Sequence, residues 1–229
     1  MTEPTPTVNA RDVHLSYGQT PALRGVSLVC WSGESVALMG PSGSGKSSLL
    51  HCLAGVLRPD SGEATVAGER LDTMSERERS QHRLSRMGMV FQFGNLIPEL
   101  TLLENVMLPL QLLGERASAA KPRALGLLDR LEVADVSGRR AGAVSGGQAQ
   151  RAAVARALVH APSVVFADEP TGALDTVSAD RVLDSLLGLA REIGSTVLVV
   201  THENRIAAHC DRLLTICDGA MAAQQAMTV

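Results

Sequence analysis

The chain has few aromatic residues, no long apolar run and no excess of positive charge. Only 2% of its 229 residues are Phe, Trp or Tyr, which leaves almost nothing to stack on nucleic-acid bases. The formal net charge is -3, so no general attraction to nucleic acid or anionic lipid is expected. No apolar run approaches the roughly 20 residues that cross a bilayer. We therefore expect no nucleic-acid partner, and any role at a membrane should depend on another protein.

The cysteines lack the spacing of a metal or redox site. None of the four forms a C-x-x-C pair, so they are expected to be small core residues in a reducing, cytoplasmic setting. They are Cys30, Cys52, Cys210 and Cys217. Residues 1–7 lack the basic-then-apolar pattern of a signal peptide, so no secretion signal is expected.

A glycine-rich stretch between residues 40 and 48 organises the rest of the chain. It fits the pattern G-x-x-x-x-G-K-[ST], follows an apolar run at 35–39 that indicates a buried strand, and opens a segment of helical spacing. Glycines let backbone N–H groups converge on an anion, and a helix N-terminus adds partial positive charge. The strand–loop–helix context favours this phosphate loop over a plain Gly/Ser-rich turn. The residues expected to contact a nucleotide here are Gly40, Ser42, Gly43, Ser44, Gly45, Lys46, Ser47 and Ser48.

Three further apolar runs each end at a polar residue that could take part in catalysis. They are 87–91 followed by Gln92, 163–167 followed by Asp168 and Glu169, and 196–200 followed by Thr201 and His202. Alternation of strand and helix implies an α/β fold with a mostly parallel sheet, whose ligand site lies at the carboxyl ends of the strands. We therefore expect these polar residues to gather around the phosphate loop.

The carboxylates after the 163–167 run suit nucleotide hydrolysis. Asp168 follows a strand, as does the acid that holds Mg²⁺ in P-loop nucleotidases, where Lys46 would reach the phosphates and Ser47 would ligate the metal. Neighbouring side chains of an extended backbone point to opposite sides, so Glu169 could align and polarise the attacking water. Alternatively, Asp168 and Glu169 are simply two exposed residues at the start of the loop that contains Pro170. Taken singly, Gln92 could also cap a strand and His202 could be a core histidine.

The region 92–161 has helical rather than strand character. Thr101 with Glu104 forms a capping box, and Pro109 should kink or stop the helix that follows. An apolar stripe predicts a second helix over 121–131, and Ser145 with Gln148 predicts a third, running to about residue 160. We predict a single domain, 1–229, in which 8–91 and 162–229 form the nucleotide-binding core and 92–161 is an inserted helical subdomain. In the core, residue 178 should begin a helix that ends at Gly194.

The start of the third helix is a second candidate anion site. It combines a capping serine, two glycines that expose the backbone and a helix N-terminus, in the residues Ser145, Gly146, Gly147 and Gln148. From these residues alone, an ordinary capped helix remains the simpler interpretation.

Ser-Gly-Gly-Gln followed by Gln-Arg, however, resembles the signature motif of ABC-transporter ATPases. The resemblance covers nearly the whole chain in the family's order. By it, Tyr17 corresponds to the adenine-stacking aromatic, 40–48 to Walker A, Gln92 to the Q-loop, 145–148 to the signature, 164–169 to Walker B, Asp175 to the D-loop and His202 to the switch histidine. Departures are small: Val144 replaces the commoner leucine, Ala149 a polar residue and Ser48 a threonine.

The resemblance implies a P-loop NTPase with a RecA-like, mostly parallel core, an antiparallel β part and the helical insert. It implies ATP and Mg²⁺ as ligands, with Ser47, Gln92 and Asp168 at the metal. It also implies a head-to-tail pair, expected to be a homodimer, in which the signature contacts the γ-phosphate of the partner's ATP. Glu169 would direct water at that phosphate, and His202 would stabilise the developing charge, with Gln92 as the third catalytic residue.

Residues 91–113 are too apolar for an ordinary surface segment, although packing within the helices accounts for part of them. In the family this region receives a helix of the membrane permease. The sequence of 91–110, with those of 171–175 and 200–203, resembles the LolD/MacB/FtsE group, which serves permeases of the MacB/FtsX type. The chain is therefore expected at the cytoplasmic face of the membrane, held there by an integral membrane permease. Truncating Phe93 or Leu96 should uncouple the permease.

Other classes of protein also contain a phosphate loop. An importer ATPase remains the alternative, because its cassette chemistry is the same. Repair and ribosomal ABC proteins need a long insertion or a second cassette, which 229 residues cannot hold. A P-loop kinase or GTPase would not need residues 145–148, and the chain has no N-K-x-D guanine-reading stretch. The sequence carries no information on the transported substrate or the direction of transport.

Overall fold

The computed structural model describes residues 6–222. Its strands, in chain order, are β1 (Pro6–Tyr17), β2 (Thr20–Trp31), β3 (Ser35–Met39), β4 (Ser61–Val66), β5 (Glu69–Arg70), β6 (Met87–Phe91), β7 (Val164–Asp168), β8 (Thr196–Val200), β9 (Arg212–Cys217) and β10 (Ala220–Met221). Its α-helices are α1 (Lys46–Leu53), α2 (Glu76–Arg86), α3 (Leu102–Leu112), α4 (Ala117–Arg130), α5 (Gly146–Leu158), α6 (Thr176–Glu192) and α7 (Asn204–Ala207). Part of the N-terminal segment on which the absence of a signal peptide was predicted, 1–5, lies outside the described residues.

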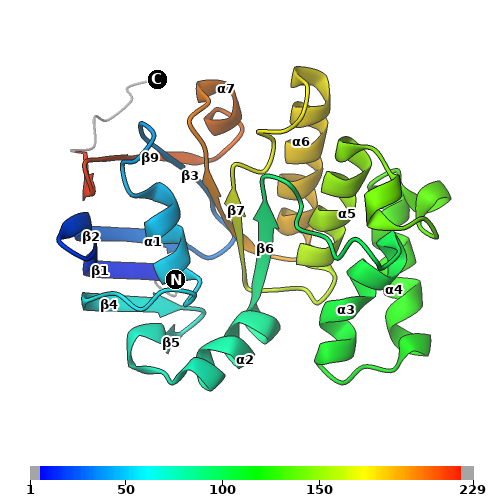
Figure 1. Cartoon of the computed structure of the whole chain (residues 1–229), viewed down its shortest axis with the longest axis horizontal. Coiled ribbons are helices and arrows are strands. Elements are labelled where there is room, and N and C mark those ends of the chain that lie inside the picture. The colour runs from blue at the N-terminus through cyan, green and yellow to red at the C-terminus, as the bar shows by residue number, and fades with distance from the viewer. Residues whose placement is uncertain (1–5, 223–229) are drawn as a thin grey trace, which may run out of the picture.

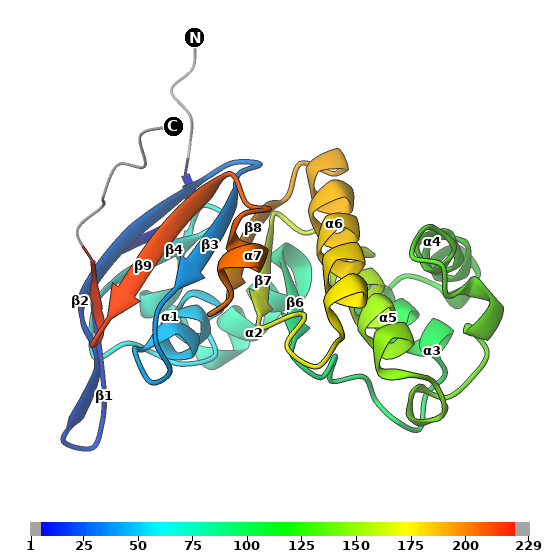
Figure 2. The same ribbon diagram turned by 90° about the horizontal axis from the view of Figure 1, so that it is seen from above.

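The strands form two sheets. The larger has the order β10-β9-β3-β8-β7-β6, in which β9 to β6 are parallel and β10 is an antiparallel edge. The smaller is antiparallel, with the order β2-β1-β4-β5. Figures 1 and 2 show the antiparallel sheet at one end of the molecule and helices α3 and α4 at the other. The predicted α/β fold with a parallel core and an antiparallel part is confirmed.

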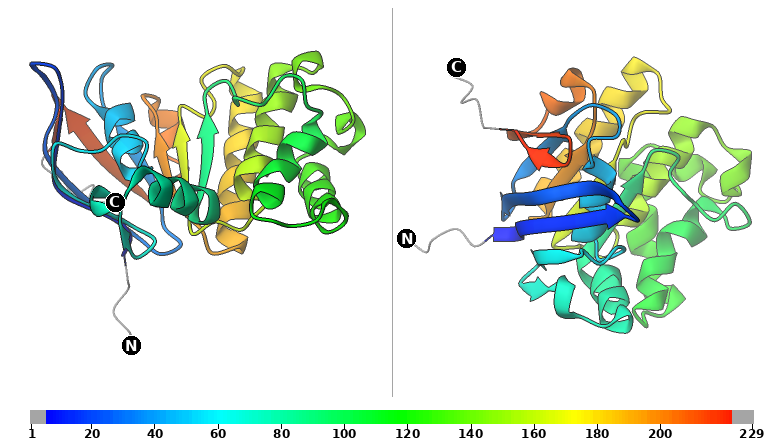
Figure 3. Two further views of the ribbon diagram at one scale, coloured as in Figure 1. Left: turned by 60° about the horizontal axis from the view of Figure 1, so that its bottom comes forward. Right: turned by 60° about the vertical axis from the view of Figure 1, so that its left-hand side comes forward.

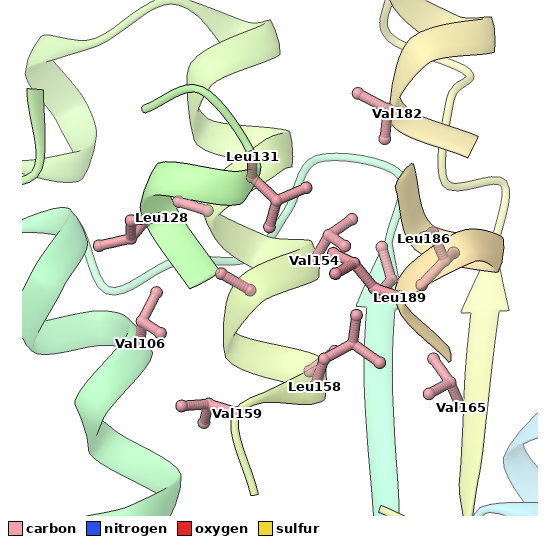
Figure 4. Close-up of a cluster of buried hydrophobic side chains, with 14 of the residues drawn as sticks. Val106, Leu128, Leu131, Val154, Leu158, Val159, Val165, Val182, Leu186 and Leu189 are labelled. Carbon is pink, nitrogen blue, oxygen red and sulfur yellow. The ribbon is translucent and has the colours of Figure 1, made fainter. Parts of the chain in front are cut away.

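Two hydrophobic cores lie on opposite faces of the parallel sheet, because successive strand residues point to opposite sides. On β7, Val164 and Phe166 pack with α1 and the antiparallel sheet, whereas Val165 and Ala167 pack with the helices of the other face. Figure 4 shows this second core, where Val165 lies near side chains of α6 and α5. The left view of Figure 3 shows α5 and α6 beside β6 and β7.

The segment between β6 and β7 is helical, as predicted. Within the described chain it contains α3, α4, α5 and short 3-10 turns, and its only β pairing is an isolated bridge between Thr101 and Arg140. Its apolar side chains belong to the same core as one face of the sheet. The division into a core and a 92–161 subdomain therefore remains a prediction.

Pro109 was predicted to kink or stop the helix that contains it; α3 continues through Pro109 to Leu112, so the proline does not stop it. Two other local predictions were wrong. Helix α6 begins at Thr176, because the side chain of Asp175 accepts the N–H of Ser178 and caps the helix. Cys217 is exposed rather than a core residue. Within residues 6–222, no helix is both long and apolar enough to cross a membrane.

Candidate functional site

The phosphate loop joins β3 to α1, and its shape depends on two glycines. A Cβ on Gly40 would lie 2.1 Å from the carbonyl oxygen of Ile216. Gly45 has a φ of 100°, and a Cβ there would lie 2.5 Å from the Ala22 carbonyl oxygen. Both distances are far below a normal contact, so the chain can make this turn only with glycine at these positions.

The loop presents unpaired donors. Among the described residues, the backbone N–H groups of Gly43, Gly45, Lys46 and Ser47 have no acceptor. Ser44 is buried, and its hydroxyl also has no hydrogen-bond partner in the part of the chain described. Such groups are costly unless a ligand or water satisfies them. The loop therefore fits the phosphates of a nucleotide.

Lys46 supplies the charge of this loop. Its side chain is largely buried, and its Nζ donates to the carbonyl oxygens of Gly40 and Pro41 at 2.8 and 2.7 Å. These contacts hold the ammonium group directly against the loop. It lies where it would meet an anion bound by the N–H groups.

The three expected strand ends meet beside the loop. The hydroxyl of Ser47 donates to Asp168 Oδ1 at 3.2 Å, and His202 Nδ1 lies 2.8 Å from Glu169 Oε1. Gln92 shares with Ser47 and both carboxylates a pocket of about 220 Å³. The structure therefore brings together the residues that were predicted to gather here.

Glu169 differs from the expectation of an extended backbone. Its φ is 47°, a left-handed conformation that is rare for a residue with a side chain. Its N–H donates to the carbonyl oxygen of Val200 at 2.9 Å, which fixes the turn. Asp168 and Glu169 still reach different partners, but the turn that ends β7 accounts for this, not strand alternation.

The two carboxylates differ in their partners. Glu169 raises the pKa of His202 above its ordinary value of 6.5, through the hydrogen bond and the attraction of the two charges. The imidazole is therefore held and is more readily protonated than a free histidine. Asp168 faces the Ser47 hydroxyl instead. Within residues 6–222 no three His, Cys, Asp or Glu side chains cluster as metal ligands, so a cation here would rely on the oxygens of Ser47, Gln92, Asp168 and the nucleotide.

Tyr17 lies at the end of β1, on the side of α1. It is 54% exposed, and its hydroxyl lies 3.3 Å from the Ser48 hydroxyl. That contact connects the exposed ring to the first turn of α1. The position is suitable for stacking on a base whose phosphates occupy the loop.

The signature turn, residues 145–148, lies away from the residues at the strand ends. Figures 1 and 2 show α1 and α5 on opposite sides of β6 and β7. The predicted capping box is confirmed, since the Ser145 hydroxyl accepts the Gln148 N–H at 3.3 Å and Gln148 Oε1 accepts the Ser145 N–H at 3.0 Å. Gly146 and Gly147 are helical, and a Cβ on either would meet nothing within 4 Å. The fold of this chain does not require these glycines.

Comparison with known proteins decides the family. A family model described as "ABC transporter" matches residues 23–172. The chain belongs to the ABC transporter family. It is the ATP-binding subunit of such a transporter and hydrolyses ATP to drive transport.

The relatives agree over almost the whole length. The cassette is 46% identical to the lipoprotein-releasing system ATP-binding protein LolD 1 of Caulobacter vibrioides, over 91% of this chain and 89% of that one. It is 40% identical to LolD of Legionella pneumophila (strain Paris), over 94% and 95%. A dimeric post-hydrolysis structure of the ATP-binding cassette MJ0796, bound to ADP and Pi, has a TM-score of 0.89 at 35% identity and covers 97% of this chain and 99% of that one.

Gln150 is a residue of this site that the sequence reasoning missed. It is buried on α5 and bonds to loops next to Gln92 and Glu169. Its position two residues after Gln148 was visible, but a glutamine inside a helix gives no sign of which distant carbonyls it will meet.

Proposed function

We propose that the chain hydrolyses ATP between the subunits of a head-to-tail homodimer and drives a MacB/FtsX-type permease that releases lipoproteins. The observation that carries the catalytic part is the convergence of Ser47, Asp168, Glu169 and His202 at one edge of the parallel sheet. The transport part is supported by identities of 40–46% to LolD proteins. Bound through its permease, the cassette would lie at the cytoplasmic face of the membrane.

Nucleotide binding is assigned to the phosphate loop and Tyr17. The free N–H groups of the loop and Lys46 hold the phosphates, and the Tyr17 ring packs on the base. Ser47, Gln92 and Asp168 would hold Mg²⁺, which would supply positive charge to offset that of the phosphates.

Hydrolysis is assigned to the residues around the turn that ends β7. Glu169 orients a water molecule and draws on its proton, while Gln92 closes the pocket from the end of β6. His202, whose pKa is raised by Glu169, donates to the oxygen on which negative charge develops. The left-handed backbone at Glu169 holds its carboxylate in place for both contacts.

The signature turn is assigned the role of contacting the ATP that is bound to the partner subunit. Ser145, Gly146, Gly147 and Gln148 lie on a free helix N-terminus, which favours an anion. Open space around both glycines is explained if another molecule approaches the backbone closely there. Asp175, which caps α6 beyond the Glu169 turn, would lie at the same interface.

The dimer is tested with Glu169→Gln, which keeps the size of the side chain but cannot serve as a base. With ATP and Mg²⁺, this variant should elute as a dimer and retain two ATP molecules, while the wild type returns to monomer as it turns over. The Lys46→Ala variant is the control and should neither bind ATP normally nor dimerise. A Glu169→Gln protein with near wild-type turnover contradicts the catalytic assignment.

The surface near residues 91–113 is assigned as the docking site of the permease. Phe93 is 74% exposed and Leu112 is 62% exposed, and both lie in the segment where a docking helix was predicted. The proposed docking surface and the signature would then both lie in the proposed 92–161 subdomain. Truncating Phe93 should abolish transport-coupled ATPase stimulation and spare basal nucleotide binding.

The proposed release of lipoproteins is tested in two ways. The first identifies the membrane protein that co-purifies with the chain, and the second is a release assay. We expect an integral membrane protein with few spans and a large external domain, and ATP-dependent release of a lipid-anchored protein from vesicles that contain the complex. Co-purification with a many-spanning permease and a separate binding protein would favour the importer alternative.

A further inference from the structure

Gln150 joins the two loops that carry Gln92 and Glu169. Its side chain lies on the second turn of α5 and is 2% exposed. Its Nε2 donates to the carbonyl oxygen of Phe91 at 2.9 Å and to that of Pro170 at 2.5 Å. Phe91 ends β6 directly before Gln92, and Pro170 directly follows Glu169. One amide group therefore fixes both loops to the same helix.

The segment after β6 is held on α5 at further points. A Cβ on Gly94 would lie 3.3 Å from both the Ala153 Cβ and the Gln150 Oε1. Arg156 donates to the carbonyl oxygens of Gly94 and Asn95 at 2.8 and 2.7 Å. Because these contacts all come from one helix, the loop must follow α5 when the helix moves.

The opposite end of α5 is the exposed signature turn. Gly146 begins the helix, and a rise of 1.5 Å per residue places Gln150 about 6 Å further along its axis. The far end of α5 packs closely on the sheet, since a Cβ on Gly88 would lie 2.3 Å from the Ala157 carbonyl oxygen. A continuous helix this short moves as one body, so a force at the turn reaches Gln150 directly.

We propose that Gln150 is a positioning residue that couples contact of the signature turn with the partner's ATP to the placement of Gln92 and Glu169 in its own subunit. This inference rests on the proposed head-to-tail dimer. Each ATP would then assist hydrolysis of the other, because α5 of one subunit touches one nucleotide and holds the loops that act on the second.

The test is Gln150→Met, which keeps the volume but removes both donated hydrogen bonds. We expect kcat to fall about tenfold while the dissociation constant for ATP changes less than about twofold. The Hill coefficient for ATP should fall toward one. Gln150→Asn keeps the amide but withdraws it by one methylene, so it should show the same loss of cooperativity and provides a second test if the methionine variant folds poorly.

Two comparison variants separate positioning from simple packing. Gln81→Met makes the same exchange at an exposed site of α2 and should behave as wild type. Gly172→Ala displaces Gln92 directly, since its Cβ would lie 2.8 Å from Gln92 Nε2, so it should lower kcat and leave the Hill coefficient unchanged. A purely structural role for Gln150 would lower the melting temperature without this division between kcat and cooperativity.

Failure of the inference can be told apart from failure of the dimer. In the Glu169→Gln background, Gln150→Met should still dimerise with ATP, because the signature turn is intact. If Gln150→Met and Gln150→Asn keep wild-type kcat and Hill coefficient, the inference is wrong. If Glu169→Gln alone fails to dimerise with ATP, the proposed function is wrong instead.

Discussion

The phosphate loop and the signature turn both contain glycines where the chain enters a helix, but for different reasons. In the loop, a Cβ on Gly40 or Gly45 would collide with carbonyl oxygens of the same chain. In the signature turn, Gly146 and Gly147 have ordinary helical backbone and open space around them. The loop is thus shaped by its own fold, whereas the turn retains glycines that its fold does not need.

Glycine early in a helix costs stability relative to alanine. Because these glycines destabilise the helix without helping the fold, their benefit must come from another molecule that approaches the backbone closely. The comparison therefore supports the proposal that the phosphate loop is formed within one subunit, whereas the signature turn acts on a nucleotide held by another subunit.

The largest effects are expected from charge changes in the phosphate loop and in the signature turn. Lys46→Ala should lower both ATP affinity and turnover, each by about a hundredfold, because it removes the ammonium group from the loop. Gly147→Asp should lower turnover as much, through repulsion of the partner's phosphates, yet leave ATP binding to the monomer unchanged. Isothermal titration and a phosphate-release assay measure both. Equal loss of monomer binding in the two variants would contradict the distinction.

Alanine substitutions test the same difference between the two groups of glycines through the stability of the fold. Gly45→Ala should destabilise the fold by about 2 kcal/mol, because of its φ of 100° and the clash with Ala22. Gly147→Ala should stabilise it by about 0.5 kcal/mol while lowering turnover. Urea unfolding gives both values. A destabilised Gly147→Ala protein would show that the turn glycines serve the fold after all.

Removal of the Tyr17 ring should weaken ATP binding by about tenfold, whereas Tyr17→Phe should have little effect. The aromatic face is the part assigned to the base, and the hydroxyl contacts only Ser48. Competition by inorganic triphosphate, which has no base, is the control: its affinity should not change in Tyr17→Ala.

The smallest effect concerns pH. Because Glu169 raises the pKa of His202 above 6.5, the pair stabilises the fold fully below pH 6.5 and loses this contribution as pH rises through the raised pKa. The contribution is small, since His202 is largely exposed. NMR titration of the His202 ring should show the raised pKa, and Glu169→Gln should return it toward 6.5.

The sequence predicted the sheet and the gathering of the site because buried strands and strand-end polar residues follow local patterns. Of the two outcomes predicted at Pro109, a kink or a stop, the stop does not occur: α3 continues to Leu112, and Val106 and Leu110 on either side of the proline are buried. The sequence could not show the left-handed turn at Glu169 or the contacts of Gln150. Both depend on partners far away in the sequence, Val200 in one case and Phe91 in the other.

The most direct test is a mixed dimer in the Glu169→Gln background, formed from one subunit with Lys46→Ala and one with Gly147→Asp. Each parent dimer has two damaged sites, whereas the mixed dimer has one intact loop facing one intact signature turn. We predict that the mixture forms a dimer that retains one ATP on gel filtration, while neither parent alone forms an ATP-bound dimer. An ATP-bound dimer of the Gly147→Asp protein alone, or no ATP-bound dimer in the mixture, would contradict the account.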